Sequence, residues 1–283
     1  NIKLGANVQG DIEIVGAKQR GTYISGQTVE INTTAVKNIY GGNTTQNNIT
    51  FAGDVNYVLN NAELSTRFNF MPFYGHMINI NGNFNIKVVA AKSITIGKAT
   101  IEQNGDCQAG RINIAGEGKG ANLVVPVGTD ISGLDQFALI SDSYFVIKTG
   151  REVDINFTEY AGEYEFDYDE TIYNLVVTDA EGNAAEYSYD DGILAFGNAG
   201  EYTVALECKE CIYDRECDTT CNRCGEVDET RVHKFSAYAP KDAAECGKNA
   251  TEIAVCDYGC GTEDIREVEG SALEHSYKWI IDK

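Results

Sequence analysis

Cysteine is concentrated in the last part of this 283-residue chain, where eight of the nine cysteines fall between Cys208 and Cys260. The remaining one, Cys107, is expected to be a buried free thiol. Several of the eight have only two or three residues between them, and Cys224 and Cys260 are each followed by Gly. A short turn between two such cysteines aims both thiolates at one metal ion, and the Gly that follows lets backbone amides approach the sulfurs. The tail is therefore predicted to be held together by sulfur chemistry rather than by a large apolar core.

The candidate metal ligands are the C-terminal cysteines and two histidines, and their spacing allows two groupings. In one, each histidine closes its own module, which gives Cys217, Cys221, Cys224 and His233, then Cys246, Cys256, Cys260 and His275, and leaves Cys208 and Cys211 over. In the other, the sets are Cys211, Cys217, Cys221 and Cys224, then His233, Cys246, Cys256 and Cys260. Both predict about two closed, structural zinc sites. Disulfides are the alternative, and the ligand spacing favours zinc.

The rest of the composition favours β structure, with 29 Gly, 16 Tyr and 11 Phe against only three Pro. A degenerate repeat of Gly, then Asp or Asn, then alternating apolar residues begins at Gly10, Gly53 and Gly82. Short strands with Asn and Gly corners, and no helical period, predict a parallel β-solenoid (β-helix) with its cap over residues 1–150. An antiparallel sandwich is the alternative for this region.

The segment 151–207 differs sharply in charge, because it holds 15 Asp and Glu residues against one Arg and so carries −14 of the chain's net −21. Its alternating apolar residues predict a small antiparallel β-sandwich, followed by an irregular, zinc-ribbon-like tail over 208–283. Asp167, Asp169 and Glu170, or Asp190 and Asp191, could bind calcium, but a solvated acidic face is the preferred interpretation.

Charge and hydropathy exclude several classes of partner. A segment this acidic repels phosphate backbones and anionic lipid surfaces, which argues against nucleic-acid and membrane binding. No apolar run reaches the roughly 18 to 20 residues that span a bilayer. Because the chain begins at Asn1 rather than Met, it is expected to be part of a longer protein.

Two stretches carry a resemblance to a known group of proteins. The run Asn38-Ile39-Tyr40-Gly41-Gly42, followed by Gly53-Asp54-Val55, resembles glycine-rich β-helix repeats, and the tail motif from Cys217 to His233, with its second copy ending at His275, resembles the Cys/His-rich modules that often follow them. These features are similar to those of secreted, multi-module surface proteins of anaerobic gut Firmicutes. The resemblance implies a secreted or cell-surface location.

Catalytic candidates in the first hundred residues are few. If their coils were neighbours, Asp11 and Asp54 would lie about one strand spacing of 4.8 Å apart, near the roughly 5–5.5 Å of retaining glycosidases. The third repeat has Asn83 instead, and Gly-Asp at a turn is explained by backbone geometry. An aromatic run could stack on sugar rings, although such a run more often packs in a core; its candidate residues are Phe70, Phe73, Tyr74 and His76.

The expected function is therefore that of a non-enzymatic, adhesin-like surface protein, with a polysaccharide or another cell-surface component as partner. The alternatives are a carbohydrate-active β-helix enzyme, either a polysaccharide lyase or a glycoside hydrolase, and a carbohydrate-binding module.

Overall fold

The structure, a computed structural model, describes residues 1–15, 21–23, 26–40, 49–69, 78–96, 99–103, 111–132, 137–139 and 144–277. These residues form strands β1 to β26 and no helix. In the described part of the chain, accordingly, no helix is long and apolar enough to cross a membrane. The chain divides into two compact units, one made of residues 1–170 and 174–207 and the other of residues 171–173 and 208–283.

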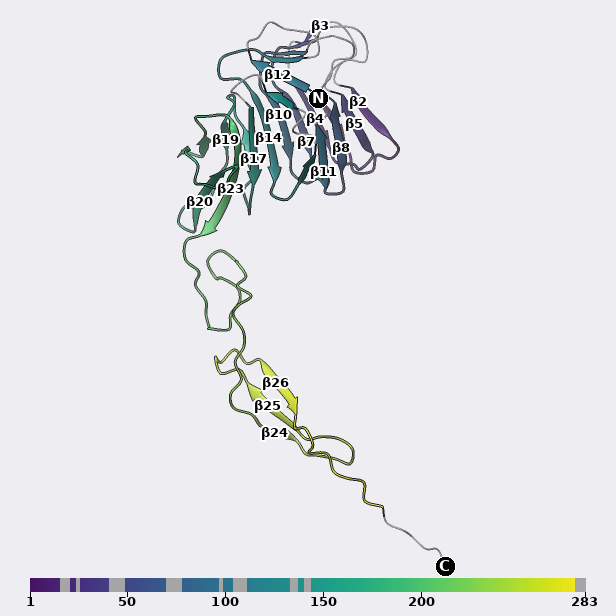
Figure 1. Cartoon of the computed structure of the whole chain (residues 1–283), viewed down its shortest axis with the longest axis vertical. Helices are drawn as coiled ribbons and strands as arrows, with labels where there is room; N and C mark the ends of the chain where they lie inside the picture. Colours follow the sequence, from purple (N-terminus) through teal and green to yellow (C-terminus); the bar gives the residue numbers. More distant parts are fainter. Residues whose placement is uncertain are drawn as a thin grey trace, which may run out of the picture. The chain divides into compact units, whose positions relative to one another are not determined.

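Three sheets with parallel pairing make up most of the first unit (Figure 1). The largest runs in the order β1 (Ile2–Leu4), β4 (Gln27–Ile31), β7 (Val55–Leu59), β10 (Phe84–Val88), β14 (Ala121–Pro126), β17 (Tyr144–Thr149), β23 (Gly200–Cys208) and β20 (Tyr173–Asp179). The second runs β15 (Asp130–Ser132), β11 (Ser93–Ile96), β8 (Ser65–Asn69), β5 (Val36–Tyr40) and β2 (Ile12–Val15). The third runs β16 (Phe137–Leu139), β12 (Ala99–Gln103), β13 (Arg111–Ile114), β9 (Ile78–Ile80), β6 (Ile49–Phe51) and β3 (Gly21–Tyr23).

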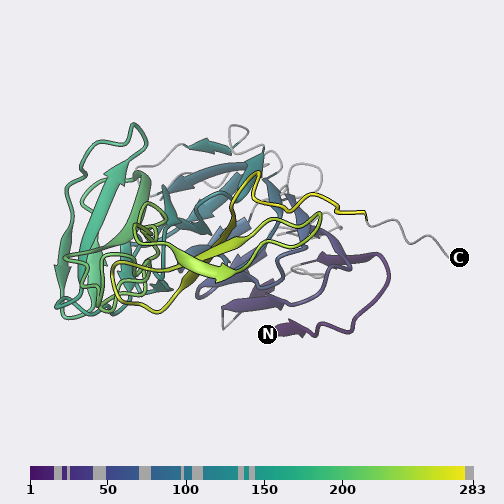
Figure 2. The same cartoon turned by 90° about the horizontal axis from the view of Figure 1, so that it is seen from below.

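The chain visits these sheets in a recurring order, because β1, β2 and β3 lie in the first, second and third sheet and β4 starts the cycle again. The cycle is interrupted once, where the consecutive strands β12 and β13 both lie in the third sheet. Figure 2 shows the same strands from below. Equivalent residues stack in register, as Val29 lies opposite Tyr57 and Tyr57 opposite Ile86. Parallel strands need such crossover connections, since a tight hairpin joins only antiparallel neighbours. The mainly β class with parallel sheets, predicted from the repeat, is confirmed.

The core of the first unit comes from the alternation of side chains along these strands. In β7, Val55, Tyr57 and Leu59 are buried while the residues between them are partly exposed. Strand β4 shows the same pattern with Val29 and Ile31. Successive residues of a strand point to opposite faces, so stacked strands place these apolar side chains in one continuous cluster.

Asparagine side chains form a hydrogen-bonded ladder across the largest sheet. Asn85 donates its amide to Asn56 Oδ1 at 2.9 Å, and Asn122 donates to Asn85 Oδ1 at 2.8 Å. Asn85 and Asn122 are both almost completely buried. Buried amides are tolerated only when they are hydrogen-bonded, and an in-register stack gives each one a donor and an acceptor. The ladder therefore fixes the register of β7, β10 and β14.

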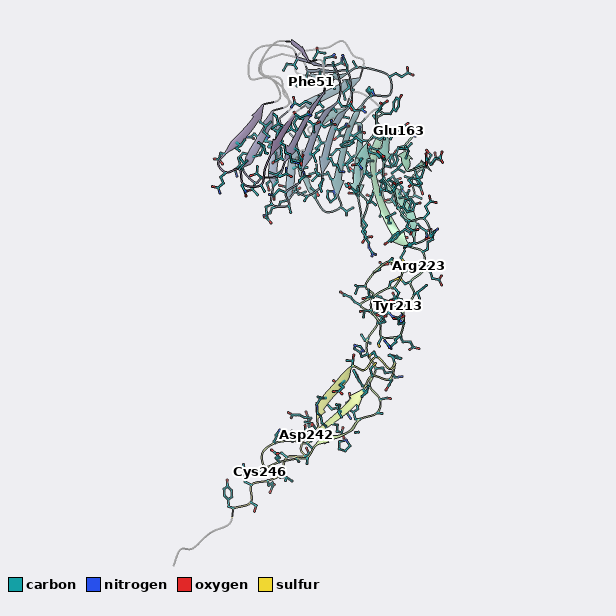
Figure 3. The ribbon with its side chains drawn as sticks, turned by 180° about the vertical axis from the view of Figure 1, so that it is seen from behind. Phe51, Glu163, Tyr213, Arg223, Asp242 and Cys246 are labelled. Atoms are coloured by element: carbon teal, nitrogen blue, oxygen red, sulfur yellow. The ribbon has the colours of Figure 1, made fainter. Side chains whose placement is uncertain are left out.

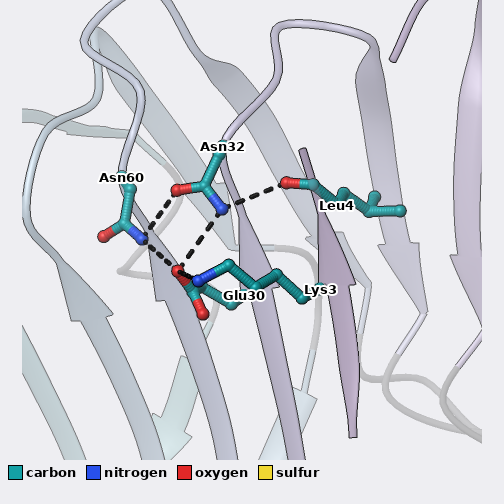
Figure 4. Close-up of polar contacts among 5 residues, drawn as sticks. All are labelled: Lys3, Leu4, Glu30, Asn32 and Asn60. Atoms are coloured by element: carbon teal, nitrogen blue, oxygen red, sulfur yellow. Dashed lines mark hydrogen bonds and ion pairs between the residues drawn. The ribbon is translucent and has the colours of Figure 1, made fainter. Parts of the chain in front are cut away.

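A second polar group lies across the first strands of this sheet (Figure 4). Asn60 donates to Asn32 Oδ1 at 2.9 Å and to Glu30 Oε1 at 3.2 Å, while Asn32 donates to the Leu4 carbonyl at 3.1 Å. Lys3 Nζ lies 2.8 Å from Glu30 Oε1, and its hydrogen bond lowers the pKa of that carboxyl group. Polar contacts thus join the adjacent parallel strands β1, β4 and β7 at this sheet edge.

The segment 151–207 differs from the predicted free-standing sandwich. It contains a four-stranded antiparallel sheet in the order β18 (Asn156–Phe157), β19 (Glu163–Glu165), β22 (Ile193–Ala195) and β21 (Ser188–Asp190). Strand β23, however, pairs in parallel with β17 and so extends the largest sheet.

Contacts of side chains explain why this segment belongs to the first unit. The fully buried Tyr164 donates its hydroxyl to Asn122 Oδ1 at 2.7 Å, at the end of the asparagine ladder. Asn83 donates to the Glu159 carbonyl at 2.9 Å, and Lys87 pairs with Asp154 at 2.7 Å. The acidic segment therefore caps the stacked strands, and the boundary between the two units falls after Glu207.

The second unit has little regular structure. Among its described residues, one three-stranded antiparallel sheet is formed, in the order β24 (Ala239–Asp242), β25 (Thr251–Val255) and β26 (Glu263–Glu267). Few apolar residues are buried in it apart from Ala254 and four of the cysteines. A region with so small a core needs another source of stability.

Candidate metal centres

Eight Cys and His side chains of the second unit come together in two groups of four. The groups are Cys208, Cys211, Cys221 and Cys224, and Cys217, His233, Cys256 and Cys260. Within each group the candidate ligand atoms all lie within 4.8 Å of one another. Either group could hold a metal ion.

The first group has the dimensions of a tetrahedral thiolate site. Cys208 Sγ lies 3.8 Å from Cys221 Sγ and 3.7 Å from Cys211 Sγ, and Cys211 Sγ lies 3.8 Å from Cys224 Sγ. A disulfide requires about 2.05 Å between the sulfurs. Four sulfurs at about 2.3 Å from a central zinc ion would be about 3.8 Å apart. The spacing therefore fits a shared cation and not a covalent S–S bond.

The second group has the same dimensions with one imidazole. Cys256 Sγ lies 3.8 Å from Cys217 Sγ, and Cys260 Sγ lies 3.4 Å from His233 Nδ1. Metal–nitrogen bonds of about 2.0–2.1 Å shorten that edge of the tetrahedron to about 3.6 Å. Cys217 and Cys256 are buried, whereas His233 is exposed. The first site thus offers four thiolates and the second offers three thiolates with one imidazole, and both sets are consistent with zinc.

Tight turns position the second Cys pair of each group. After Cys224 the chain turns at Gly225, which has φ of +72°, and after Cys260 it turns at Gly261, with φ of +81°. Only glycine adopts this region without strain. The Cys221 amide then donates to the Glu226 carbonyl at 2.7 Å, and the Cys256 amide donates to the Thr262 carbonyl at 2.9 Å. We call each of these turns, residues 221–226 and 256–262, a knuckle.

The knuckles also favour thiolates. At Cys260, hydrogen bonds from the Thr262 hydroxyl and amide lower the pKa to about 6. At Cys221, desolvation raises the pKa, but hydrogen bonds from the Cys211 thiol and from backbone amides of its own turn outweigh it and bring the pKa to about 6. Cys208 shows the opposite shift in pKa, to about 12, because of its hydrogen bond with the neighbouring Cys224. Four thiols this close cannot all ionise without a cation, because the negative thiolates repel one another, and a bound cation compensates that repulsion.

Both predicted groupings of the ligands are wrong in detail. Cys217 does not join Cys221 and Cys224, although it stands only four residues before Cys221 in the sequence. Cys246, labelled in Figure 3, and His275 belong to neither group and instead lie together, with Sγ 2.7 Å from Nδ1. Cys208 and Cys211, left over in one prediction, supply half of the first site. The predicted number of four-ligand clusters, two, agrees with the structure.

Each copy of the tail motif also carries a tyrosine–arginine pair. Tyr213 and Tyr238 each lie under an arginine, with Arg231 Cζ 3.8 Å and Arg266 Cζ 3.6 Å from the respective ring centroids, so each copy of the motif has one such pair. The ligand groups show that the copies are offset, because Cys256 and Cys260 of the second copy meet Cys217 and His233 of the first. Spacing between neighbouring cysteines alone does not reveal this.

The catalytic candidates do not meet at one corner. Asp11 precedes β2 in the second sheet, whereas Asp54 precedes β7 in the largest sheet, so the two Gly-Asp copies are not equivalent positions. The stacked equivalent of Asp54 is Asn83, whose backbone amide donates to Asp54 Oδ1 at 2.7 Å. Asp54 therefore binds the backbone that leads into β10, the strand next to β7.

Two other candidate sites complete the comparison. Phe70, Phe73, Tyr74 and His76 lie outside the described residues, as does Cys107. Among the described residues, the candidate calcium ligands of segment 151–207 do not appear in a group of three or more potential metal ligands.

A comparison with protein-family models, with curated proteins and with solved structures found no match for this chain.

Proposed function

We propose that this chain is a structural, adhesin-like protein of the cell surface or the extracellular space, in which a β-solenoid carries a tail that two zinc ions hold folded. The observation that carries the proposal is the pair of four-ligand clusters in a unit with almost no apolar core. Four soft protein ligands close the coordination sphere and leave no position for a water or substrate. Such zinc is structural.

The solenoid is supported by the recurring order in which the chain visits three parallel sheets, interrupted only at β12 and β13, and by the in-register stack of Val29, Tyr57 and Ile86. In a solenoid each coil buries its apolar face only against its neighbours, which explains the continuous core and the asparagine ladder. Such an array presents a regular outer surface, to which a polysaccharide or another cell-surface component is the proposed partner.

A structural role for the solenoid is also supported by the acidic corner at Asp54. The Asp54 carboxylate accepts a backbone amide from the next coil, and the side chain of Asn83 accepts the Gly120 amide at 2.9 Å. These corner side chains therefore hold successive coils together.

Elemental analysis combined with thiol titration tests the zinc part of the proposal. The purified chain is expected to contain near-stoichiometric zinc at two sites, and its tail thiols become titratable after chelation. Metal-free protein whose tail cysteines are oxidised would show that disulfides, and not zinc, hold the tail.

A screen of polysaccharides tests the solenoid part, with binding and release of reducing ends measured on the same samples. Binding without turnover is expected. Turnover that Asp11→Asn or Asp54→Asn abolishes would instead establish a carbohydrate-active enzyme.

A further inference from the structure

The tail consists of two structurally equivalent modules, residues 213–235 and 238–277, which we call the first and second module. Each starts with a tyrosine that lies under the module's arginine. Each ends with a histidine next to an aromatic ring two residues later, with centroids 6.1 Å apart for His233 and Phe235 and 6.0 Å apart for His275 and Tyr277. The modules are therefore repeats in three dimensions as well as in sequence.

The knuckles are equivalent in the backbone too. In the first module Thr220 forms an antiparallel bridge with Val227, and in the second Val255 pairs with Glu263 in the same way. These bridges flank the matching hydrogen bonds from Cys221 and from Cys256. Residue for residue, Cys221 corresponds to Cys256.

Each module divides its four ligands between two sites. The knuckle cysteines face an earlier ligand pair: Cys221 and Cys224 meet Cys208 and Cys211, and Cys256 and Cys260 meet Cys217 and His233. The outer ligands, which are the first cysteine and the histidine, face a later knuckle. Cys217 and His233 are the outer pair of the first module, and Cys246 and His275 are the outer pair of the second.

The backbone holds this last pair together. Cys246 forms a parallel bridge with Leu273, two residues before His275, and the Gly247 amide donates to the Leu273 carbonyl at 3.1 Å. The Leu273 amide in turn donates to the Glu245 carbonyl at 3.0 Å. Both side chains, Cys246 and His275, are exposed. The pair is thus an accessible, preformed ligand pair of the same composition as Cys217 with His233.

Among the described residues, no Asp, Glu, Cys or His adds a third ligand atom to this pair, because the two four-residue groups are the only ones of three or more. Apart from those two groups and this pair, the chain's remaining Cys and His are Cys107 and His76, which are far away in the sequence and outside the described residues. The two further ligands that a tetrahedral ion needs are not among the described residues.

Resting on the zinc sites proposed above, we propose that Cys246 and His275 are half of a third zinc site, completed by a Cys-x2-Cys-Gly or Cys-x3-Cys-Gly knuckle of another module of this kind. The donor set argues for zinc, because a thiolate with an imidazole is the same half that Cys217 and His233 supply to the second site. The tail is then an open-ended series in which each ion joins one module to the next.

Metal binding requires a small opening of the pair. Its Sγ and Nδ1 atoms are 2.7 Å apart, whereas a tetrahedral zinc ion separates such ligands by about 3.6 Å. Rotation of two exposed side chains supplies this movement, while the backbone bridge between Cys246 and Leu273 stays in place.

The full chain carrying Cys107→Ser provides the test. Zinc alone is added, and the zinc content and molecular mass are measured; then a synthetic peptide with the sequence of residues 256–262 is added as a knuckle probe. We expect a third ion to bind beyond the first two, together with zinc-dependent capture of the peptide. Cys246→Ser and His275→Ala lose the third ion and the peptide but keep two ions. The neighbouring Glu274→Gln keeps all three.

The results of this experiment distinguish the possible sources of the two further zinc ligands. Dimerisation with one additional ion per two chains would join two Cys246–His275 pairs without a knuckle and would overturn the proposed partner, whereas peptide capture by a monomer supports a knuckle of another module. Two ions that remain bound, with neither a third ion nor peptide capture, would overturn this inference and leave the proposed zinc tail intact. Loss of one of the first two ions in His275→Ala would also overturn it, and a chain without zinc would overturn both proposals.

Discussion

Two glycines next to Asp54 illustrate how a hydrogen atom in place of a side chain allows two backbones to meet. A Cβ atom built on Gly26 would lie 2.1 Å from the Asp54 carbonyl oxygen, and one built on Gly82 would lie 2.5 Å from the Asp54 amide nitrogen. Backbone atoms at these distances cannot yield without moving a neighbouring strand. In the Gly-Asp/Asn repeat, Gly82 therefore allows close approach of two backbones, whereas no atom lies within 4 Å of a Cβ built on Gly10.

Gly82→Ala is expected to destabilise the first unit by about 1–3 kcal/mol or more, because the added methyl group overpacks a corner made of backbone. Urea unfolding followed by circular dichroism measures the effect. Gly197→Ala is the matched control, since no atom lies within 4 Å of its added Cβ. Equal midpoints for the two variants would contradict the close packing at this corner.

The ligand sets make a second prediction at the scale of single residues. Cys217→Ser and Cys256→Ser remove ligands from the same site, so each variant, and the double variant, should lose one zinc ion. Cys217→Ser combined with Cys221→Ser should lose both ions, although these residues are close in the sequence. Zinc content per chain gives the result, and the opposite pattern would restore grouping by sequence neighbours.

At the scale of strands, the alternation of apolar residues was enough to predict that strands form, but not which strands pair. Strand β23 has an alternating sequence that suits either a small sandwich or the edge of a large sheet. Its parallel pairing with β17 extends the largest sheet, and contacts of Asn83 and Tyr164 join the same segment to strands of that sheet, which no local pattern encodes. The structure thus places β23 in the largest sheet, whereas the sequence predicted a small sandwich.

The asparagine ladder offers a test of register. Asn85→Ala removes the central amide and leaves the buried Asn122 without its acceptor, so we expect a loss of about 1–3 kcal/mol in the free energy of unfolding. Chemical denaturation measures this loss against Asn198→Ala, a control at an exposed asparagine. A neutral Asn85→Ala would mean that the ladder does not contribute to stability.

At the scale of the whole molecule, the two units depend on different interactions. The first unit has a continuous apolar core, whereas the second has two Cys/His clusters and few buried apolar residues. Cysteine content predicted this difference, because a short segment with few apolar residues cannot bury enough area alone. Which cysteines share an ion could not be predicted from spacing, because the two sets interleave: Cys217 precedes Cys221 but belongs to the later site.

Removal of zinc with a chelator should therefore unfold the second unit and leave the first folded, since structural zinc contributes on the order of 10–16 kcal/mol to folding of such modules. Hydrogen exchange is the suitable measurement. The amides of Cys221 and Cys256 should lose protection, while that of Tyr57 keeps it. Retained protection throughout the second unit would indicate that metal is not required.

Acid should have the same effect as chelation. Cys221 and Cys260 have pKa values lowered to about 6, so their thiolates persist as the pH falls from the ordinary thiol range towards 6 and are protonated below it. The stability that depends on these thiolates is accordingly present at higher pH and is lost as the pH falls through 6. Bound zinc shifts this loss of stability to a still lower pH. Zinc release followed with a colorimetric indicator should begin only below about pH 6; release that starts above about pH 7 would contradict these lowered pKa values.

The interleaved ligand sets also have a mechanical consequence. A metal ion at the first site would close a loop from Cys208 to Cys224, and one at the second would close a loop from Cys217 to Cys260, so the loops would overlap between Cys217 and Cys224. With both ions bound, tension applied to the ends of the tail would pass through both ions and the short link between Cys217 and Cys221, so neither loop could lengthen until a coordination sphere breaks. Extension of this region would then be limited by metal–ligand bonds, and its resistance to pulling would follow the supply of zinc.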